Sequence, residues 1–520
     1  MSASRPGTTA RRMGLLGPAL GLFTLILRWA PGPWPVDDAY ITFRYARNLL
    51  EGAGLVYNPG EPVLGTSAPG FALLLALGGG VTGLDLPRLA VAVSGVADAM
   101  TALMLLAMAR HLGLAGWAGA CAGLAWALYP LAVRYAVGGM ETSVATALGM
   151  GALVLWLRGA GAAAMAPAGL ALLVRPDLLA HAGAIALGEA VATRRVPWRP
   201  LGVLGLVLLP WAAVATVRYG SPIPHSVVAK SQGVYHVAPG ESLLQVCYFL
   251  AGLLLAGPAD LAAEGIAVHR PPGASGGLVA VAALVLAVFA VGAWAAVQGC
   301  PRAAVPFAVP LLFGLAYAGL GLRGTLMAEW YLVPVAPVLL LGLVAGSIVA
   351  SRRLPRGASV AAGAALALVL AQAAGWSWGR VVDGEAPRPR IVRVEREELY
   401  REAALFLRPR LGAEDVVAAP EIGSLGYHCR CRILDTAGLV SPRALRYYPL
   451  APDLHVVNQA VPPGLVRDER PAWIVTLDVF AARSLLAAPG LADQYQVERA
   501  APARAFGSRS LLVLRRREGA

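Results

Sequence analysis

Long apolar segments separated by short polar connections fill the first 380 positions of the chain. A helix needs roughly 18 or more apolar residues to cross the hydrocarbon core of a membrane. Several of the segments are shorter than this, and 162–192 reads as either one interrupted span or two. The pattern predicts a polytopic α-helical membrane protein. We expect about 11 transmembrane helices, at 13–30, 88–109, 115–133, 142–157, 162–174, 177–192, 199–218, 276–297, 303–320, 330–350 and 358–378.

The pattern changes near position 380, where polar residues become frequent and the apolar runs become short. Runs at 416–419, 473–480 and 510–516 have the length of β-strands, and 395–408 has helical spacing. We therefore expect a transmembrane domain at 1–379 and a small C-terminal α/β domain at 380–520.

Composition supports a membrane protein and argues against nucleic acid as a partner. Hydrophobic residues make up 57% of the chain and charged residues 14%, whereas soluble domains carry about 25% charged residues. The net charge is +13. Much of this excess lies in short loops between apolar segments, as the positive-inside rule predicts for a protein whose partner is membrane lipid.

The charges also predict an orientation. With an odd number of spans and an inside N-terminus, one set of connections is rich in arginine and the opposite set is acidic. The basic set contains Arg110, Arg158, Arg194, Arg195, Arg199, Arg302, Arg352, Arg353 and Arg356. The C-terminal domain is thus expected on the outer face of the membrane. This orientation requires the apolar stretches 67–83 and 243–256 to lie in the outer interface without crossing.

The five cysteines give no disulfide framework and no zinc spacing. Cys429 and Cys431 would share one face of a strand. A metal or redox role for this pair is left open.

The first outer loop, 31–87, carries two adjacent carboxylates directly after a membrane span. Asp37 and Asp38 precede a segment, 39–50, whose apolar residues have helical spacing. It is expected to form an amphipathic helix along the outer surface. The aspartates could simply cap this helix. However, charges beside a membrane are costly and often functional.

Other polar groups fall on the same predicted side. Glu141 begins a span, and Pro176 should force Arg175 out of the helix beside Asp177. Lys230 is the only lysine of the chain. Each group alone could be a helix end or an interfacial anchor. Together they predict a cavity that binds hydroxyl groups at one end and a phosphate at the other.

Several of these segments resemble the GT-C fold glycosyltransferases. DDAYITFRYARNLLEGAGLVYNPGEPV is similar to their first outer loop, most of all in bacterial enzymes like the mycobacterial terminal β-(1→2)-arabinofuranosyltransferase. LGTSAPGFALLLAL resembles their G-x-T-S-P-L-W segment, with Ala68 inserted and Phe71 in place of Trp. GGMETSVATAL, LLVRPDLLAHA and TAGLVSP resemble further elements. SPIPHSVVAK does so too, with His225 in place of the usual Asn.

The resemblance implies a polyprenyl-phosphate sugar as donor and an extracytoplasmic glycan, lipid or protein as acceptor. It also implies that the acidic pair Asp37 and Asp38 is catalytic. Together with the predicted cavity, it indicates these substrate-binding candidates: Tyr40, Arg44, Asn58, Glu61, Thr66, Ser67, Glu141, Arg175, Asp177, His225, Lys230, Glu329, Trp330 and Tyr331.

Chemistry assigns roles to these residues. The acceptor hydroxyl needs a general base, and the departing prenyl phosphate needs a cation such as Arg175 or Lys230. A divalent cation on Asp37 or Asp38 could share that role. Asp38 lies nearer the helix and is the better cap, so Asp37 is favoured as the base. Direct displacement would invert the anomeric centre.

Three alternatives remain at the level of sequence. They are a lipid-linked glycan polymerase or ligase, a lipid-sugar transporter or flippase, and a nonenzymatic scaffold. A transporter would be expected to show related halves, and the sequence contains no repeat. A transferase requires Asp37 or Asp38 to share one cavity with Arg175 and Lys230.

Overall fold

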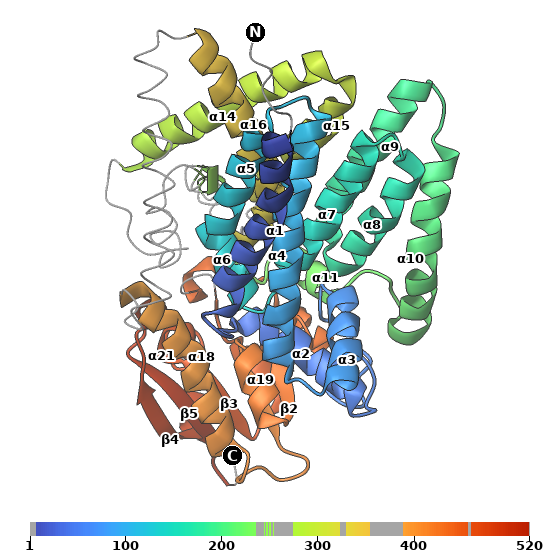
Figure 1. Ribbon diagram of the computed structural model, residues 1–520. Helices are drawn as coiled ribbons and strands as arrows, with labels where there is room; N and C mark the ends of the chain where they lie inside the picture. The colour runs from blue at the N-terminus through green and yellow to red at the C-terminus, as the bar shows by residue number, and fades with distance from the viewer. Residues whose placement is uncertain are drawn as a thin grey trace, which may run out of the picture.

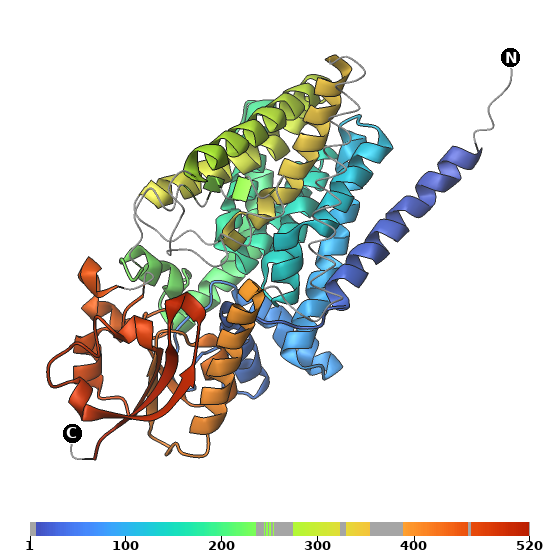
Figure 2. The ribbon, with the colours of Figure 1, turned by 90° about the vertical axis from the view of Figure 1, so that its left-hand side faces the viewer.

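The computed structural model describes residues 7–235, 274–322, 329–353, 388–455 and 459–518, with a few positions between 244 and 253. It shows a bundle of long helices and, at one end of it, a domain built on a β-sheet (Figure 1). The N-terminal end of the first helix lies at the other end of the bundle (Figures 1 and 2). The predicted combination of a helical part and a small C-terminal sheet domain is confirmed.

Every predicted apolar segment from 13–30 to 330–350 falls on a helix, whereas 358–378 and most of 243–256 lie outside the described residues. Five of the described helices are long and apolar enough to span a membrane, and the count rises to 6 if a bent pair is one span. The predicted number of about 11 spans is therefore not established. The bundle helices are α1 Gly7–Trp29, α4 Leu86–His111, α5 Gly116–Leu128, α6 Pro130–Val137, α7 Thr142–Leu157, α8 Gly161–Val174, α9 Leu179–Thr193, α10 Trp198–Tyr219, α14 Ala274–Gly299, α15 Ala304–Leu322 and α16 Ala336–Arg353.

Prolines set the breaks that matter for the site. Pro130 begins α6, and the axes of α5 and α6 differ by 51° at this point. Pro176 follows α8, and Arg175 takes an extended conformation (φ −151°, ψ 116°). The predicted break at Arg175 is thus confirmed, because proline disfavours helical backbone in the residue before it.

The loop after α1 forms two helices, α2 (Asp37–Leu50) and α3 (Pro69–Thr82). The helix predicted at 39–50 is present, and most of its side chains are buried. Ala39, Phe43 and Ala46 belong to the core of the bundle, and Tyr45 belongs to the core of the sheet domain. The helix α2 is therefore held between the two parts.

The C-terminal domain contains a five-stranded sheet with the order β2-β1-β3-β5-β4. The strand β1 is parallel to β2 and β3, whereas β5 is antiparallel to β3 and β4. The long helix α18 and the short helix α19 pack against each other beside the sheet (Figure 1). The bounds are α18 Arg388–Leu407, β1 Val416–Ala419, α19 Gly423–Cys429, β2 Arg432–Asp435, α20 Pro463–Glu469, β3 Trp473–Leu477, α21 Asp478–Ala481, β4 Tyr495–Pro502 and β5 Ser510–Arg516.

A buried ion pair joins α1 to α4. Arg28 Nε lies 2.6 Å from Asp98 Oδ2, and both side chains are fully buried. Arg28 Nη1 also donates to the Ala127 carbonyl at 2.7 Å. Arg28 is thus paired with an acid and with backbone carbonyls, as a charge inside a membrane bundle must be.

Candidate active site

A cavity of about 310 Å³ lies where the first loop meets the ends of several bundle helices. Asp38 lines this cavity together with Arg175 and Lys230, which is the arrangement that a transferase requires. We call it the larger cavity. Of the residues predicted from the sequence, it is lined by Asp38, Thr66, Ser67, Glu141, Arg175, Asp177, Lys230, Trp330 and Tyr331.

Arg175 is already fully engaged by protein groups. Its Nε and Nη2 donate to the two carboxylate oxygens of Asp177 at 3.1 and 2.5 Å, and Nη1 lies 3.5 Å from Glu141 Oε1. Nη1 also donates to Thr142 Oγ1 and to the Trp330 carbonyl. A forked guanidinium can hold two carboxylates in this way. Arg175 therefore fixes the acidic side of the larger cavity.

Lys230 lies at the end of the short helix α11 (His225–Ser231) and has fewer partners. Its Nζ contacts the Tyr331 hydroxyl at 3.0 Å and lies over the Tyr331 ring. Burial lowers the pKa of Lys230, but Tyr331 and Asp38 outweigh this and raise it above its ordinary value. Lys230 thus stays charged and keeps donors for an anionic group.

Stacked aromatic rings form one side of the larger cavity. The rings of Tyr317 and Tyr331 are 5.5 Å apart and nearly parallel, and Trp330 contacts Tyr331 edge-on. The Tyr317 hydroxyl donates to Asp177 at 2.6 Å. An apolar surface with few fixed polar groups is typical of a site for an organic ligand.

A smaller cavity of about 160 Å³ adjoins the larger one. Asp38, Lys230, Trp330 and Tyr331 line both. The remaining polar groups come mainly from the C-terminal domain. They are Arg396, Glu421 and Gln459, together with Asp37 and Tyr235.

The two adjacent aspartates have different environments. Asp38 is exposed and lines both cavities. Asp37 is buried, and its oxygens accept the backbone N–H groups of Gly423 (3.0 Å) and Ser424 (2.8 Å). Burial raises the pKa of Asp37 to about 6, although Arg396 opposes this. Neither side chain caps α2, whose N-cap is Val36. The expectation that Asp38 caps α2 is therefore wrong: Asp38 lines both cavities, whereas Asp37 caps the helix α19 and lines only the smaller cavity.

Five predicted site residues do not line either cavity. Arg44, Asn58 and Glu61 join the first loop to the C-terminal domain, where Asn58 Nδ2 donates to the Ile433 carbonyl and Glu61 pairs with Arg432. Tyr40 packs on the rings of Tyr427 and His428. His225 lies one residue from the cavity, which Ser226 lines instead. For Glu329 the side chain lies outside the described residues.

Sequence reasoning missed four residues near the site. Tyr317 lies within an apolar run read only as a span, and Ser226 follows the noted His225. Arg396 and Glu421 lie in a domain for which no site was predicted, and Arg396 donates to Glu421 Oε1 at 2.9 Å. Only the long-range packing of α19 onto α2, with α18 packed on α19, brings these two residues to the site.

The side chains around the two cavities offer few free ligands for a divalent cation. Within the described residues, no three His, Cys, Asp or Glu side chains are grouped to hold a metal ion. Glu141 and Asp177 are already bound by Arg175. The described residues alone do not fit a metal centre, so no step is assigned to one.

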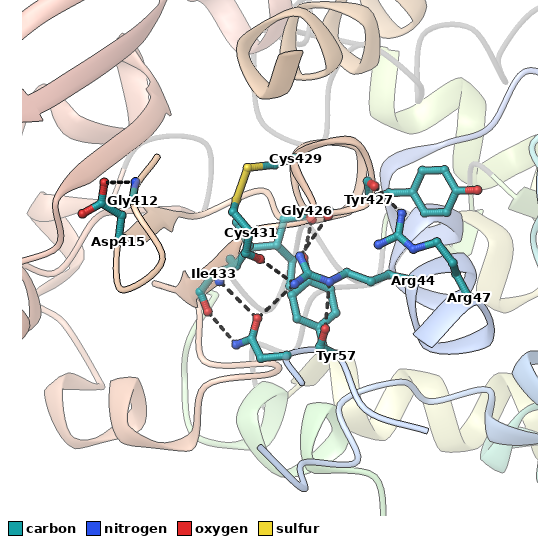
Figure 3. The surroundings of a disulfide bond; sticks show 12 residues. Arg44, Arg47, Tyr57, Gly412, Asp415, Gly426, Tyr427, Cys429, Cys431 and Ile433 are labelled. Carbon is teal, nitrogen blue, oxygen red and sulfur yellow. Dashed lines mark hydrogen bonds between the residues drawn. A yellow bond between two sulfur atoms is a disulfide. The ribbon is translucent and has the colours of Figure 1, made fainter. Parts of the chain in front are cut away.

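The cysteine pair whose metal or redox role the sequence left open is joined by a disulfide. Cys429 and Cys431 form a disulfide at the end of α19 (Figure 3). Arg430 between them takes a left-handed conformation (φ 59°) that reverses the chain. The pair is therefore part of a turn and not a strand face.

Comparisons with known proteins place this geometry in context. Residues 390–514 match a domain of unknown function, DUF8728. A terminal β-(1→2)-arabinofuranosyltransferase of Mycobacterium tuberculosis is 31% identical over 39% of this chain and 37% of its own length. The chain thus aligns with little more than a third of that relative.

Solved structures match over nearly the whole chain. ArnT from Cupriavidus metallidurans in the apo state covers 98% of both chains, with 17% identity and a TM-score of 0.55. The oligosaccharyltransferase AglB from Archaeoglobus fulgidus covers 92% of this chain and 72% of its own, with 12% identity and a TM-score of 0.55. These similarities confirm the resemblance that the motifs indicated. The chain has the fold of the GT-C membrane glycosyltransferases.

Proposed function

We propose that the protein transfers a sugar from a polyprenyl-phosphate donor to a hydroxyl group of an extracytoplasmic glycan, lipid or protein. One observation carries this proposal: an exposed carboxylate, Asp38, shares a cavity with the cations Lys230 and Arg175 and also lines a second, smaller cavity. A base placed between two cavities can serve a reaction between two substrates.

The proposed reaction is a single displacement. The donor lies in the larger cavity with its phosphate at Lys230, and the acceptor hydroxyl approaches from the smaller cavity. Asp38 removes the hydroxyl proton as the acceptor oxygen bonds to the anomeric carbon. The bond from that carbon to the phosphate oxygen breaks, and Lys230 stabilises the released phosphate. The configuration at the anomeric carbon is inverted.

The relatives support the choice of a lipid-phosphate donor. ArnT has been solved bound to undecaprenyl phosphate, with a TM-score of 0.52 to this chain. AglB has been solved with an inhibitory peptide and a dolichol-phosphate. Both have the fold found here, and the larger cavity offers a cation beside aromatic side chains.

The direct test is incubation of the purified protein with a panel of polyprenyl-phosphate sugars and candidate acceptors. Release of the prenyl phosphate with one sugar added to an acceptor is the expected result. Products that carry chains of sugars would instead indicate a polymerase or ligase. Consumption of no donor in the panel, with or without added divalent cation, would argue against the transferase. A loss of activity on chelation that added divalent cation restores would show that transfer depends on a metal ion.

Lys230→Ala is expected to raise the donor KM about 10- to 100-fold, because a charge-assisted hydrogen bond contributes roughly 1.5–3 kcal/mol. Steady-state kinetics at varied donor concentration measures this. Lys230→Arg keeps the positive charge and should retain more donor binding than the alanine variant. An unchanged KM in Lys230→Ala would remove this residue from the phosphate site.

The proposed reaction also requires the site to face outward. A reporter active only outside the cytoplasm, fused to the C-terminus, is expected to be active in the bacterial inner membrane. The same fusion with a reporter active only inside should be silent. The opposite pair of results, from stably expressed fusions, would place the C-terminal domain in the cytoplasm and contradict the proposed orientation.

A further inference from the structure

The segment Gly423–Cys431, which contains α19 and the disulfide, packs directly on the helix that carries Asp38. We call it the docking segment. Asp37 binds its start through the N–H groups of Gly423 and Ser424. Arg44, two turns further along α2, binds its end through the carbonyls of Gly426 (2.9 Å) and Cys431 (2.6 Å) (Figure 3).

Glycines make this approach close enough. A Cβ atom on Gly423 would lie 1.8 Å from the backbone oxygen of Asp37, and one on Gly426 would lie 2.0 Å from the Tyr57 hydroxyl. A side chain at Gly423 would push α2 and α19 apart, and one at Gly426 would displace the Tyr57 hydroxyl and the Arg44 guanidinium. The contact therefore fixes the backbone of α2 at the residue next to Asp38.

The two faces of α2 have different tasks. Residues seven apart lie on one face of a helix, so Asp37 and Arg44 turn together toward the docking segment. Asp38 and Thr42, four apart, form another face that lines the larger cavity. The rotation of α2 about its axis, set by the first face, determines where the Asp38 carboxylate lies.

Arg44 and Asp37 make these hydrogen bonds from buried positions. Arg44 is 1% exposed, and its Nε also donates to the Tyr57 carbonyl at 2.8 Å. The backbone N–H of Asp37 donates to Glu397 Oε1 of α18 at 3.2 Å. The C-terminal domain thus holds α2 at Asp37, in its first turn, and again about two turns later at Arg44.

We propose that Asp37 and Arg44 are positioning residues, which use the docking segment of the C-terminal domain to hold Asp38 in the larger cavity. This rests on the proposed function, in which Asp38 is the base. The sheet domain then takes part in the reaction by orienting a residue of the first loop, in addition to lining the smaller cavity.

The test is a double-mutant cycle between each positioning residue and Asp38. Asp37→Asn and Arg44→Lys are expected to lower kcat about 10- to 100-fold with little change in donor KM, since an error of about 1 Å in a catalytic group can cost about 100-fold. In an Asp38→Asn background, neither variant should lower the residual kcat further, because they act through Asp38.

The control is Glu51→Gln, which removes an exposed ion pair with Arg430 between the same two elements. It should leave kcat unchanged. If the kcat loss of Asp37→Asn or Arg44→Lys multiplied with the kcat loss of Asp38→Asn in the double variants, these residues would act independently of Asp38 and the positioning role would be overturned. A normal kcat in both Asp37→Asn and Arg44→Lys would overturn it as well. If Asp37→Asn does not fold, the kcat of Arg44→Lys alone tests the positioning role. A normal kcat in Asp38→Asn itself would instead overturn the proposed function, so the two failures are distinguishable.

Discussion

Asp38→Asn is expected to lower the turnover of sugar transfer by at least about 100-fold and by up to about 10,000-fold, which is the range of general-base assistance. Asparagine keeps the size of the side chain but cannot accept the proton of the acceptor hydroxyl. Donor binding should be largely retained, because Lys230 and the aromatic side chains of the larger cavity are unchanged. Single-turnover kinetics with a saturating donor separates the chemical step from binding.

The matched control is Asp85→Asn, at the N-cap of α4. Asp85 is exposed and accepts the backbone N–H of Arg88, and asparagine caps helices equally well. This variant should transfer sugar at the normal rate. Normal turnover in Asp38→Asn would show that another group takes the proton. Asp37 would then be the next residue to test, since it lines the smaller cavity and has a raised pKa of about 6.

Arg175→Ala is expected to destabilise the protein by about 3–5 kcal/mol, because removal of one partner leaves buried charge uncompensated. Arg175 is 4% exposed, and its loss would leave Asp177 and Glu141 without their cation. Reduced yield and a lower Tm in detergent are the measurements. The sequence instead offered Arg175, like Lys230, as a cation for the departing phosphate.

Arg88→Ala provides the comparison for Arg175→Ala. Arg88 pairs with Asp85 on the surface, and exposed ion pairs contribute at most about 1 kcal/mol. Its Tm should be close to that of the unchanged protein. A normal Tm together with weak donor binding in Arg175→Ala would instead show that Arg175 binds the donor phosphate.

Much of the fold follows from hydrophobic patterning. The apolar segments, the helix at 39–50 and the runs that became β1, β3 and β5 were predictable because each buries a continuous or periodic apolar surface. The strands β2 and β4 were missed. The strand β4 has mostly exposed side chains at the edge of the sheet, so its sequence lacks the apolar signal.

The candidate site was predictable where motifs lie beside membrane spans, as for Glu141, Arg175 and Lys230. It was not predictable where two distant segments meet. Residues of the first loop and of the C-terminal domain touch only in the fold, so the sequence could not show that Asp37 faces α19 while Asp38 faces the larger cavity. Adjacent aspartates look alike in a sequence, and helix rotation separates them.

The contact between α2 and the docking segment also bears on biosynthesis. Arg44 and the Gly426 carbonyl are 382 residues apart in the chain, so the ribosome completes almost the entire membrane part before the partner of Arg44 emerges. Until then the positive charge of Arg44 must remain hydrated or be held by another protein. Long-range contacts of this kind form late in folding. The nascent chain therefore inserts into the membrane before α2 can meet the docking segment, and a ribosome that stops early releases a protein in which this contact never forms.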